Sequence, residues 1–186
     1  TYDHKKALKK SLSFNKNKRK IHAVMSISSD VPYTVSLIAK KLNLRGIPVK
    51  TAEIFSNKYL MKNEFKKIGL NVPNFFLIKT FQDLKNKISR FNFSVLKPVD
   101  SRGARGVFLI NKNERKLKSL FNLSMKFSPR KEIILEEYLA GPQLSTESII
   151  NNYKVYTVGV SDRNYEYLGK YKPNIIENGS DMPSKF

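Results

Sequence analysis

The chain has 186 residues, a formal net charge of +20 and a hydrophobic fraction of 40%, which is enough for a packed core and excludes global disorder. It contains no cysteine, which excludes disulfides, thiolate zinc sites and thiol nucleophiles. His4 and His22 are its only histidines, so a metal site built from several histidines is excluded as well.

The first part of the chain, residues 1–55, indicates a partial open α/β domain. Residues 4–12 suit a short basic helix, and residues 21–27 (IHAVMSI) form an apolar run of strand length. Residues 28–30 (SSD) offer capping side chains, and Pro32 then stands where the first turn of an amphipathic helix accepts proline. The sequence therefore predicts one strand–helix unit here.

The region from residue 56 onward alternates helix and strand signals and then becomes rich in strands. Ser56 or Asn57 can cap a helix that ends at Gly69, and Thr80 with Asp83 resembles a capping box. Further helices are expected over residues 80–91 and 114–127, and strands over residues 75–78, 93–97, 107–110, 132–138, 143–150 and 153–160, the last two joined by a turn at residues 151–152. This order predicts α/β first, followed by an α+β region with antiparallel strands.

A loop between two of these strands is rich in hydrogen-bond donors. In SVLKPVDSRGARGVFLI, Gly103 and Gly106 allow tight turns, and Ser101, Arg102 and Arg105 add a hydroxyl and two guanidinium groups to the backbone amides. A polyphosphate needs such donors. An ordinary surface hairpin would show the same composition, and the loop matches neither the Walker A pattern nor the dinucleotide-binding fingerprint.

Two lysines and one acidic strand end accompany this loop. Lys97 ends an apolar strand directly before a proline, and Lys58 occupies a first helical turn, where the helix dipole disfavours a cation. An anionic ligand would explain both positions, although solvated lysines could also occupy them. Glu136 and Glu137 follow three apolar residues and should point to opposite faces of their strand. The backbone groups after this strand could read an adenine edge, although an acidic strand end that only pairs with surrounding lysines would show the same sequence.

Taken together, three segments resemble the ATP-grasp superfamily. SNKYLMKNEFKKIGLNVPNF is similar to the segment that opens its ATP-binding module, LKPVDSRGARGV to its second lysine and phosphate-covering loop, and ILEEYLAGPQLSTESII to its adenine-hinge strand and the strand that follows. The similarity covers about residues 21 to 180 and is strongest to the carbamoyl-phosphate synthase and carboxylate–amine ligase branches.

The resemblance implies an ATP-grasp fold whose parent protein is an ATP-dependent carboxylate–amine ligase. Residues 1–55 would be a partial pre-ATP-grasp domain and residues 56–186 the ATP-grasp domain, with a small lobe over 56–135 and an incomplete second lobe from 136. The lysines would contact the phosphates, the loop would cover them, and the acidic strand end would hold the adenine. The residues implied to bind ATP are Lys58, Lys97, Ser101, Arg102, Gly103, Ala104, Arg105, Gly106, Glu136, Glu137, Tyr138, Leu139 and Gln143.

Two features depart from the family pattern. Gln143 stands where the family usually has a glutamate for the ribose, and a neutral amide binds a hydroxyl more weakly. The acidic residues late in the chain lack the family's Glu-x-Asn spacing, so we expect the Mg²⁺ ligands beyond Phe186 and none within the sequence. Because the chain begins with Thr1 rather than Met, we also expect it to be a piece of a longer protein.

The expected partners are therefore ATP and a small carboxylate, activated as an acyl phosphate for attack by an amine. We expect a cytoplasmic protein, because no apolar run could span a bilayer and no signal peptide opens the chain. Two alternatives remain, a basic nucleic-acid-binding module and an ATP-grasp remnant without turnover. Lysines spread along the whole chain favour a solvated surface over the first of these.

Overall fold

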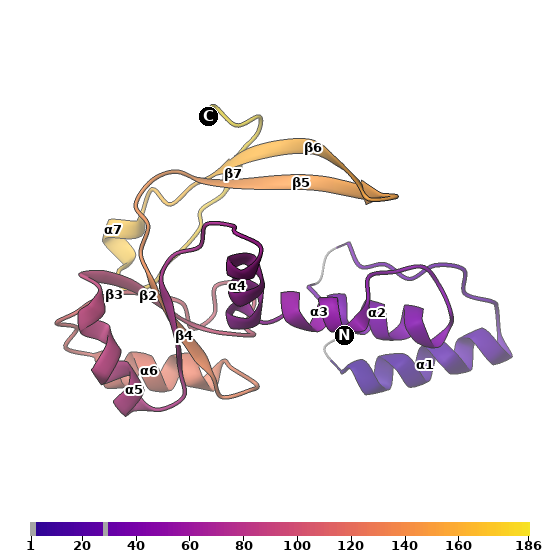
Figure 1. Cartoon of the computed structure of the whole chain (residues 1–186), viewed down its shortest axis with the longest axis horizontal. Coiled ribbons are helices and arrows are strands. Elements are labelled where there is room, and N and C mark those ends of the chain that lie inside the picture. The colour runs from indigo at the N-terminus through magenta and orange to yellow at the C-terminus, as the bar shows by residue number, and fades with distance from the viewer. Residues whose placement is uncertain (1–2, 28–29) are drawn as a thin grey trace. The chain divides into compact units, whose positions relative to one another are not determined.

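The computed structural model describes residues 3–27 and 30–186, which form two compact units divided between Val72 and Pro73 (Figure 1). In the described residues of the first unit, all regular secondary structure is helical. Its helices are α1 (His4–Asn17), α2 (Pro32–Lys41), α3 (Val49–Phe55) and α4 (Lys58–Lys67). The helix expected over residues 4–12 is confirmed and runs five residues further.

The strand predicted over residues 21–27 is wrong. This segment is irregular, and the side chains of Met25 and Ile27 are 77% and 88% exposed. A strand needs a neighbour that accepts its backbone hydrogen bonds, and the described residues of this unit contain no other strand. Apolar composition alone therefore did not produce a strand here.

The ends of the helices follow the local signals closely. Pro32 stands at the start of α2 as predicted, whereas the proposed caps Ser28 and Ser29 lie outside the described residues. The Asn57 side chain caps α4 by accepting the amides of Tyr59 and Leu60, at 3.0 and 3.1 Å. This cap fixes where α4 begins. α2 instead follows Val31 with no side-chain cap, so the cap predicted from Asp30 is wrong.

At the other end of α4, Gly69 takes a φ of +79°, which favours glycine, as the sequence predicted. The amide of Leu70 donates to the carbonyl of Phe65, and that of Gly69 to the carbonyl of Lys66. This pair of bonds is the Schellman arrangement that ends a helix.

The second unit contains a four-stranded antiparallel sheet in the order β1-β4-β2-β3. Its strands are β1 (Phe75–Ile78), β2 (Phe93–Pro98), β3 (Phe108–Asn111) and β4 (Ile133–Glu137). Helices α5 (Phe81–Lys87) and α6 (Leu117–Lys126) lie against it, and a 3₁₀ turn over Ile88–Arg90 follows α5 (Figure 1). The predicted strands and helices of this part are confirmed within a few residues at each end.

The hydrophobic core lies between this sheet and its helices. Leu96, Ile110 and Leu135 from the strands pack with Leu84 of α5 and Phe121 of α6. Because side chains alternate along a strand, the neighbours of Leu96 and Leu135 in sequence point to the other face of the sheet. That face carries the candidate site.

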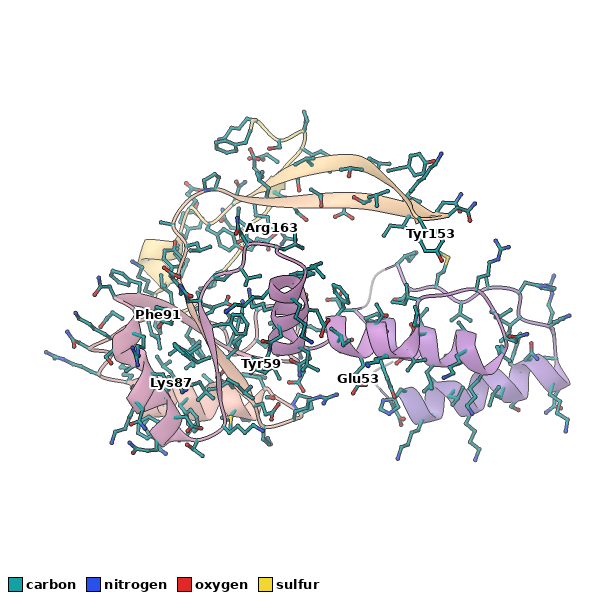
Figure 2. The ribbon with its side chains drawn as sticks, in the orientation of Figure 1. Glu53, Tyr59, Lys87, Phe91, Tyr153 and Arg163 are labelled. Carbon is teal, nitrogen blue, oxygen red and sulfur yellow. The ribbon has the colours of Figure 1, made fainter. Side chains whose placement is uncertain are left out.

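A second sheet follows in the order β5-β6-β7. Its strands are β5 (Gln143–Asn151), β6 (Lys154–Arg163) and β7 (Ser180–Asp181), with the short helix α7 (Leu168–Tyr171) between the last two. The hairpin turn lies one residue later than predicted, at Asn152 and Tyr153, which have φ values of 47° and 63°. Figure 2 shows Tyr153 at the tip of this hairpin.

Residues 173–174, between α7 and β7, contact the edge of the first sheet through their backbone. Phe108 of β3 forms an isolated antiparallel bridge with Asn174, and the amide of Leu109 donates to the carbonyl of Pro173 at 2.7 Å. The segment that follows β6 therefore extends the edge of the first sheet. The finer domain boundaries at residues 55 and 135 stay predictions.

Candidate functional site

The centre of the site is a pair of opposite charges on neighbouring strands. Lys97 on β2 and Glu136 on β4 lie on the face of the sheet away from α5 and α6, because their neighbours Leu96 and Leu135 fill the core. The Lys97 ammonium group contacts the Glu136 carboxylate directly. The structure thus brings together two predicted site residues that are 39 positions apart in sequence.

Both members of this pair are largely buried. The side chain of Lys97 is 18% exposed and that of Glu136 only 8% exposed. Removing two charges from water is unfavourable unless each has a partner. The pair can therefore persist at this depth, and a ligand that binds here meets one cation and one hydrogen-bond acceptor held in fixed places.

The end of β4 presents its backbone beside this pair. The amide of Glu137 donates to the carbonyl of Asn74 at 2.8 Å, and the amide of Tyr138 donates to the carbonyl of Phe93 at 3.3 Å. The Glu137 carboxylate accepts the side-chain amide of Asn74 at 2.9 Å. These bonds fix the strand end, and Leu139 follows directly after it with 62% exposure.

Residues 101–106 (loop 101–106) connect β2 to the segment before β3. Gly103, Ala104 and Gly106 all have positive φ values, of 62°, 53° and 73°. The Ser101 hydroxyl donates to the carbonyl of Arg105 at 3.0 Å, and Nε of Arg105 donates to the carbonyl of Arg102 at 3.2 Å. These two hydrogen bonds within the loop restrict its conformation.

One end of loop 101–106 is tightly packed, whereas its tip is not. A Cβ atom at Gly106 would lie 3.1 to 3.2 Å from atoms of Phe127, Pro98 and Ser124, but one at Gly103 would meet nothing within 4 Å. A cavity of about 600 Å³ also borders the loop, between α6 and residues 174–179. The tip consequently has room to move while Gly106 stays fixed.

The residue predicted for the ribose lies in a polar cluster on the second sheet. Gln143 begins β5 opposite Arg163 of β6, and its side chain hydrogen-bonds the Tyr165 hydroxyl. Arg163, labelled in Figure 2, forms an ion pair with Glu177. Burial, and next the negative charge of Glu177, raise the pKa of Tyr165 above its ordinary value.

The remaining predicted residue, Lys58, is the first residue of α4. It belongs to the first compact unit, so its place beside the phosphates stays a prediction.

The acidic residues that the structure describes do not form a magnesium site. Within residues 3–27 and 30–186 no three His, Asp or Glu side chains gather as metal ligands would. Three of the late acids have other partners, since Asp162 accepts from the amide of Lys185 at 3.2 Å, Glu177 pairs with Arg163, and Asp181 accepts from Asn164 at 3.1 Å.

Comparison with known proteins identifies the family. The profile of the ATP-grasp domain matches residues 55–185.

The chain belongs to the ATP-grasp family.

D-Alanine–D-alanine ligase from Wolbachia pipientis wMel is 28% identical over 132 residues, which cover 70% of this chain and 41% of that protein. The chain thus spans about two fifths of the length of the curated relatives it matches.

Solved structures agree on the ATP-grasp fold. An L-amino acid ligase from Bacillus licheniformis has a TM-score of 0.72 and 23% identity, and the match covers 94% of this chain and 39% of that one. The biotin carboxylase domain of Hydrogenobacter thermophilus 2-oxoglutarate carboxylase, solved with MgADP and bicarbonate, has a TM-score of 0.67 and 18% identity, covering 87% of this chain and 37% of that one. The nucleic-acid alternative receives no support from these comparisons. In the described part of the chain, no helix has the length and hydrophobicity to cross a membrane.

Sequence reasoning missed one group beside this ATP-grasp loop. Asp100, the residue before the loop, accepts hydrogen bonds from Ser128 and from the amide of Arg130. Its partners are 28 and 30 positions away, so no local pattern could reveal them. The position of Ser128 and Arg130 shortly before β4 was the only feature of the sequence that placed them near the site.

Proposed function

We propose that this chain is the ATP-binding part of an ATP-dependent ligase that activates a carboxylate as an acyl phosphate for attack by an amine. The observation that carries the proposal is the Lys97–Glu136 pair, largely buried on the face of the first sheet away from α5 and α6, on a strand that leads into a glycine-containing loop of donors. Each charge of the pair partners the other, which holds both in fixed places. A nucleotide would use both, because its phosphates need cations and its adenine amino group needs an acceptor.

In this proposal each group has one task. Lys97 neutralises phosphate charge, and the amides and guanidinium groups of loop 101–106 cover the terminal phosphates. Glu136 accepts from the adenine amino group, and the backbone from Glu137 to Leu139 reads the edge of the ring. Lys58 adds a second phosphate contact.

The neighbouring sheet would hold the sugar. Gln143 would bond a ribose hydroxyl after leaving Tyr165, and Tyr138 and Leu139 would wall the adenine pocket. When bound, ATP supplies the phosphoryl group that makes the carboxylate reactive. The protein contributes positioning, charge neutralisation and exclusion of water.

The names of the relatives suggest the kind of carboxylate. Both the Wolbachia protein and the Bacillus licheniformis protein are named as amino acid ligases. We therefore propose an amino acid as the activated carboxylate of the longer protein, with Mg²⁺ held by residues outside those described. The present chain would then bind nucleotide without turning it over at an enzymatic rate.

The test is a calorimetric titration of the chain with ATP and ADP, repeated with Lys97→Met and Lys112→Met. Lys112 is an exposed lysine just after β3, so its replacement makes the same chemical change away from the site. We expect the wild type and Lys112→Met to bind equally and Lys97→Met to bind at least about tenfold more weakly, since a charge-assisted bond contributes about 1.5–3 kcal/mol.

Equal ATP affinity in all three proteins would overturn the assignment of Lys97. An ADP-release assay on the longer protein with amino acids then separates the ligase from the remnant. The ligase releases ADP only when an amino acid is present, and a remnant releases none.

A further inference from the structure

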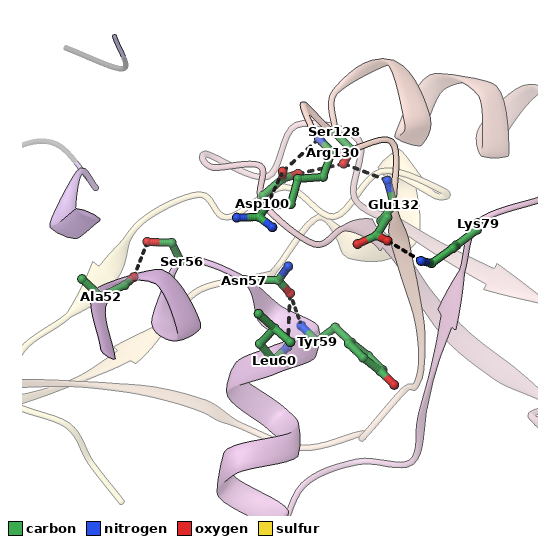
Figure 3. A network of polar contacts seen from close by, with 10 residues as sticks. All are labelled: Ala52, Ser56, Asn57, Tyr59, Leu60, Lys79, Asp100, Ser128, Arg130 and Glu132. Atoms are coloured by element: carbon green, nitrogen blue, oxygen red, sulfur yellow. Dashed lines mark hydrogen bonds and ion pairs between the residues drawn. The ribbon is translucent and has the colours of Figure 1, made fainter. Parts of the chain in front are cut away.

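We propose that Asp100 is the positioning residue that holds loop 101–106 ready for the phosphates. The inference rests on the proposed function, because it takes the triphosphate to be the ligand of the loop. Asp100 itself would not touch the nucleotide. Its task is to tie the start of the loop to residues 128–132 (turn 128–132), which lead directly into β4 (Figure 3).

The carboxylate of Asp100 is satisfied on both oxygens. Ser128 Oγ donates to Oδ1 at 2.8 Å, and the amide of Arg130 donates to Oδ2 at 3.1 Å. The Arg130 guanidinium adds a longer ion pair to Oδ2, at 4.0 Å. Hydrogen bonds to a charged acceptor are about twice as strong as neutral ones, so this is a firm attachment for a loop.

The acceptor lies in a protected place. The side chain of Asp100 is 13% exposed, and Ser128 is fully buried. Ser128 Oγ also accepts the amide of Glu132 at 3.1 Å, and the amide of Val99 donates to the carbonyl of Glu132 at 3.2 Å. Asp100 therefore joins an ordered network whose other members belong to the turn before the adenine-hinge strand.

The far end of the loop rests on the same part of the chain. Gly106 packs against Ser124 and Phe127, which lie just before turn 128–132. Both ends of the loop are thus fixed to residues 124–132, and only the tip between them can move. Ligand binding to such a loop costs less conformational entropy than binding to a loop that must be ordered over its whole length.

The hydrogen bonds of Asp100 also compensate its negative charge. A carboxylate one residue before a phosphate-binding loop would repel the phosphates if it were unpaired. With two hydrogen-bond donors and a guanidinium around it, its charge is compensated by groups outside the loop. The charge of Asp100 therefore does not depend on the arginines of the loop for its compensation.

This role predicts a split between two ligands. Adenosine occupies only the hinge and ribose positions, whereas ATP also needs the loop. Asp100→Ala should weaken ATP binding by about tenfold, equivalent to about 1.4 kcal/mol, and change adenosine binding by less than about twofold. Asp100→Asn keeps one acceptor oxygen, so its affinity for ATP should lie between that of the wild type and that of Asp100→Ala.

Glu132→Gln is the matched control. It breaks the Lys79–Glu132 ion pair of 2.8 Å in the same turn and leaves the backbone bonds of Glu132 in place. Its affinity for both ligands should equal that of the wild type. Hydrogen exchange without any nucleotide gives a second measurement, in which Asp100→Ala should speed exchange at the amides of Val99 and Arg130.

The experiment is titration calorimetry of the whole chain with ATP and with adenosine, beside the exchange measurement. Equal weakening of both ligands, or no weakening of ATP, would overturn the positioning role while leaving the nucleotide site intact. A wild type that binds neither ligand would refute the proposed function instead. In that case unchanged exchange at Val99 and Arg130 would still refute the anchoring by Asp100.

Discussion

Replacing Gly106 with alanine tests the packing of the loop most severely. Gly106 has a φ of 73°, and an added Cβ atom would lie 3.1 Å from Phe127 and 3.2 Å from both Pro98 and the Cα atom of Ser124. An L-residue in this left-handed region costs about 1–2 kcal/mol. Forcing a methyl group into a packed site costs about 1–3 kcal/mol more, and here one neighbouring atom is backbone and cannot move aside easily.

Gly103 supplies a control within the same loop. Its φ is 62°, but a Cβ atom there would meet nothing within 4 Å. Gly103→Ala should therefore lose only the conformational part, about 1–2 kcal/mol, and Gly106→Ala about 2–5 kcal/mol. The difference between the two variants isolates packing from backbone strain.

The assay is urea unfolding followed by circular dichroism, with the free energy of unfolding extrapolated to water. We expect the midpoint for Gly106→Ala to fall well below that for Gly103→Ala. The reasoning is refuted if Gly106→Ala is no less stable than Gly103→Ala, because the loop end would then be free to move away from α6.

Three further predictions follow from single features of the structure. Asp83→Asn should lower the melting temperature at pH 7, because backbone hydrogen bonds from Thr80 and then Lys79 hold the pKa of Asp83 below 3.8. A depressed carboxyl pKa stabilises the fold only above the unfolded value, so the difference in melting temperature between variant and wild type should shrink as the pH falls below about 3.8. Tyr153→Gly should stabilise the second sheet by about 1 kcal/mol in urea unfolding, because the exposed Tyr153 occupies a turn position with a φ of 63° that glycine adopts freely, and a loss of stability would count against this turn. Asn57→Ala should destabilise α4 by about 1 kcal/mol, seen as faster hydrogen exchange at the amides of Tyr59 and Leu60, because both lose their capping acceptor; unchanged exchange there would show that the cap is not formed.

Local signals in the sequence predicted much of the second unit. The capping box of Thr80 and Asp83 and the end of β2 at Pro98 are set by residues close in sequence, and the structure confirms them. The short helix α3 (Val49–Phe55) was not predicted, because no side chain caps it. The run at residues 21–27 failed for the opposite reason, since its composition suits a strand but the described residues offer no partner.

The site itself was partly predictable. Lys97 and Glu136 could be singled out by their places at strand ends, and the structure places them in contact. Their direct ion pair, and the attachment of Asp100 to Ser128 and Arg130, depend on contacts across many residues of chain. Such contacts follow from strand register and from the path of the α6–β4 connection, which no local pattern specifies.

The most direct test of the central claim is hydrogen exchange of the whole chain with and without saturating ATP, read by mass spectrometry on short peptides. The nucleotide should slow exchange in residues 95–106, which hold Lys97 and the loop, and in residues 134–139, which hold the adenine hinge. Protection confined to the lysine-rich helix α1, with residues 95–106 and 134–139 unchanged, would contradict a nucleotide site on this face of the sheet.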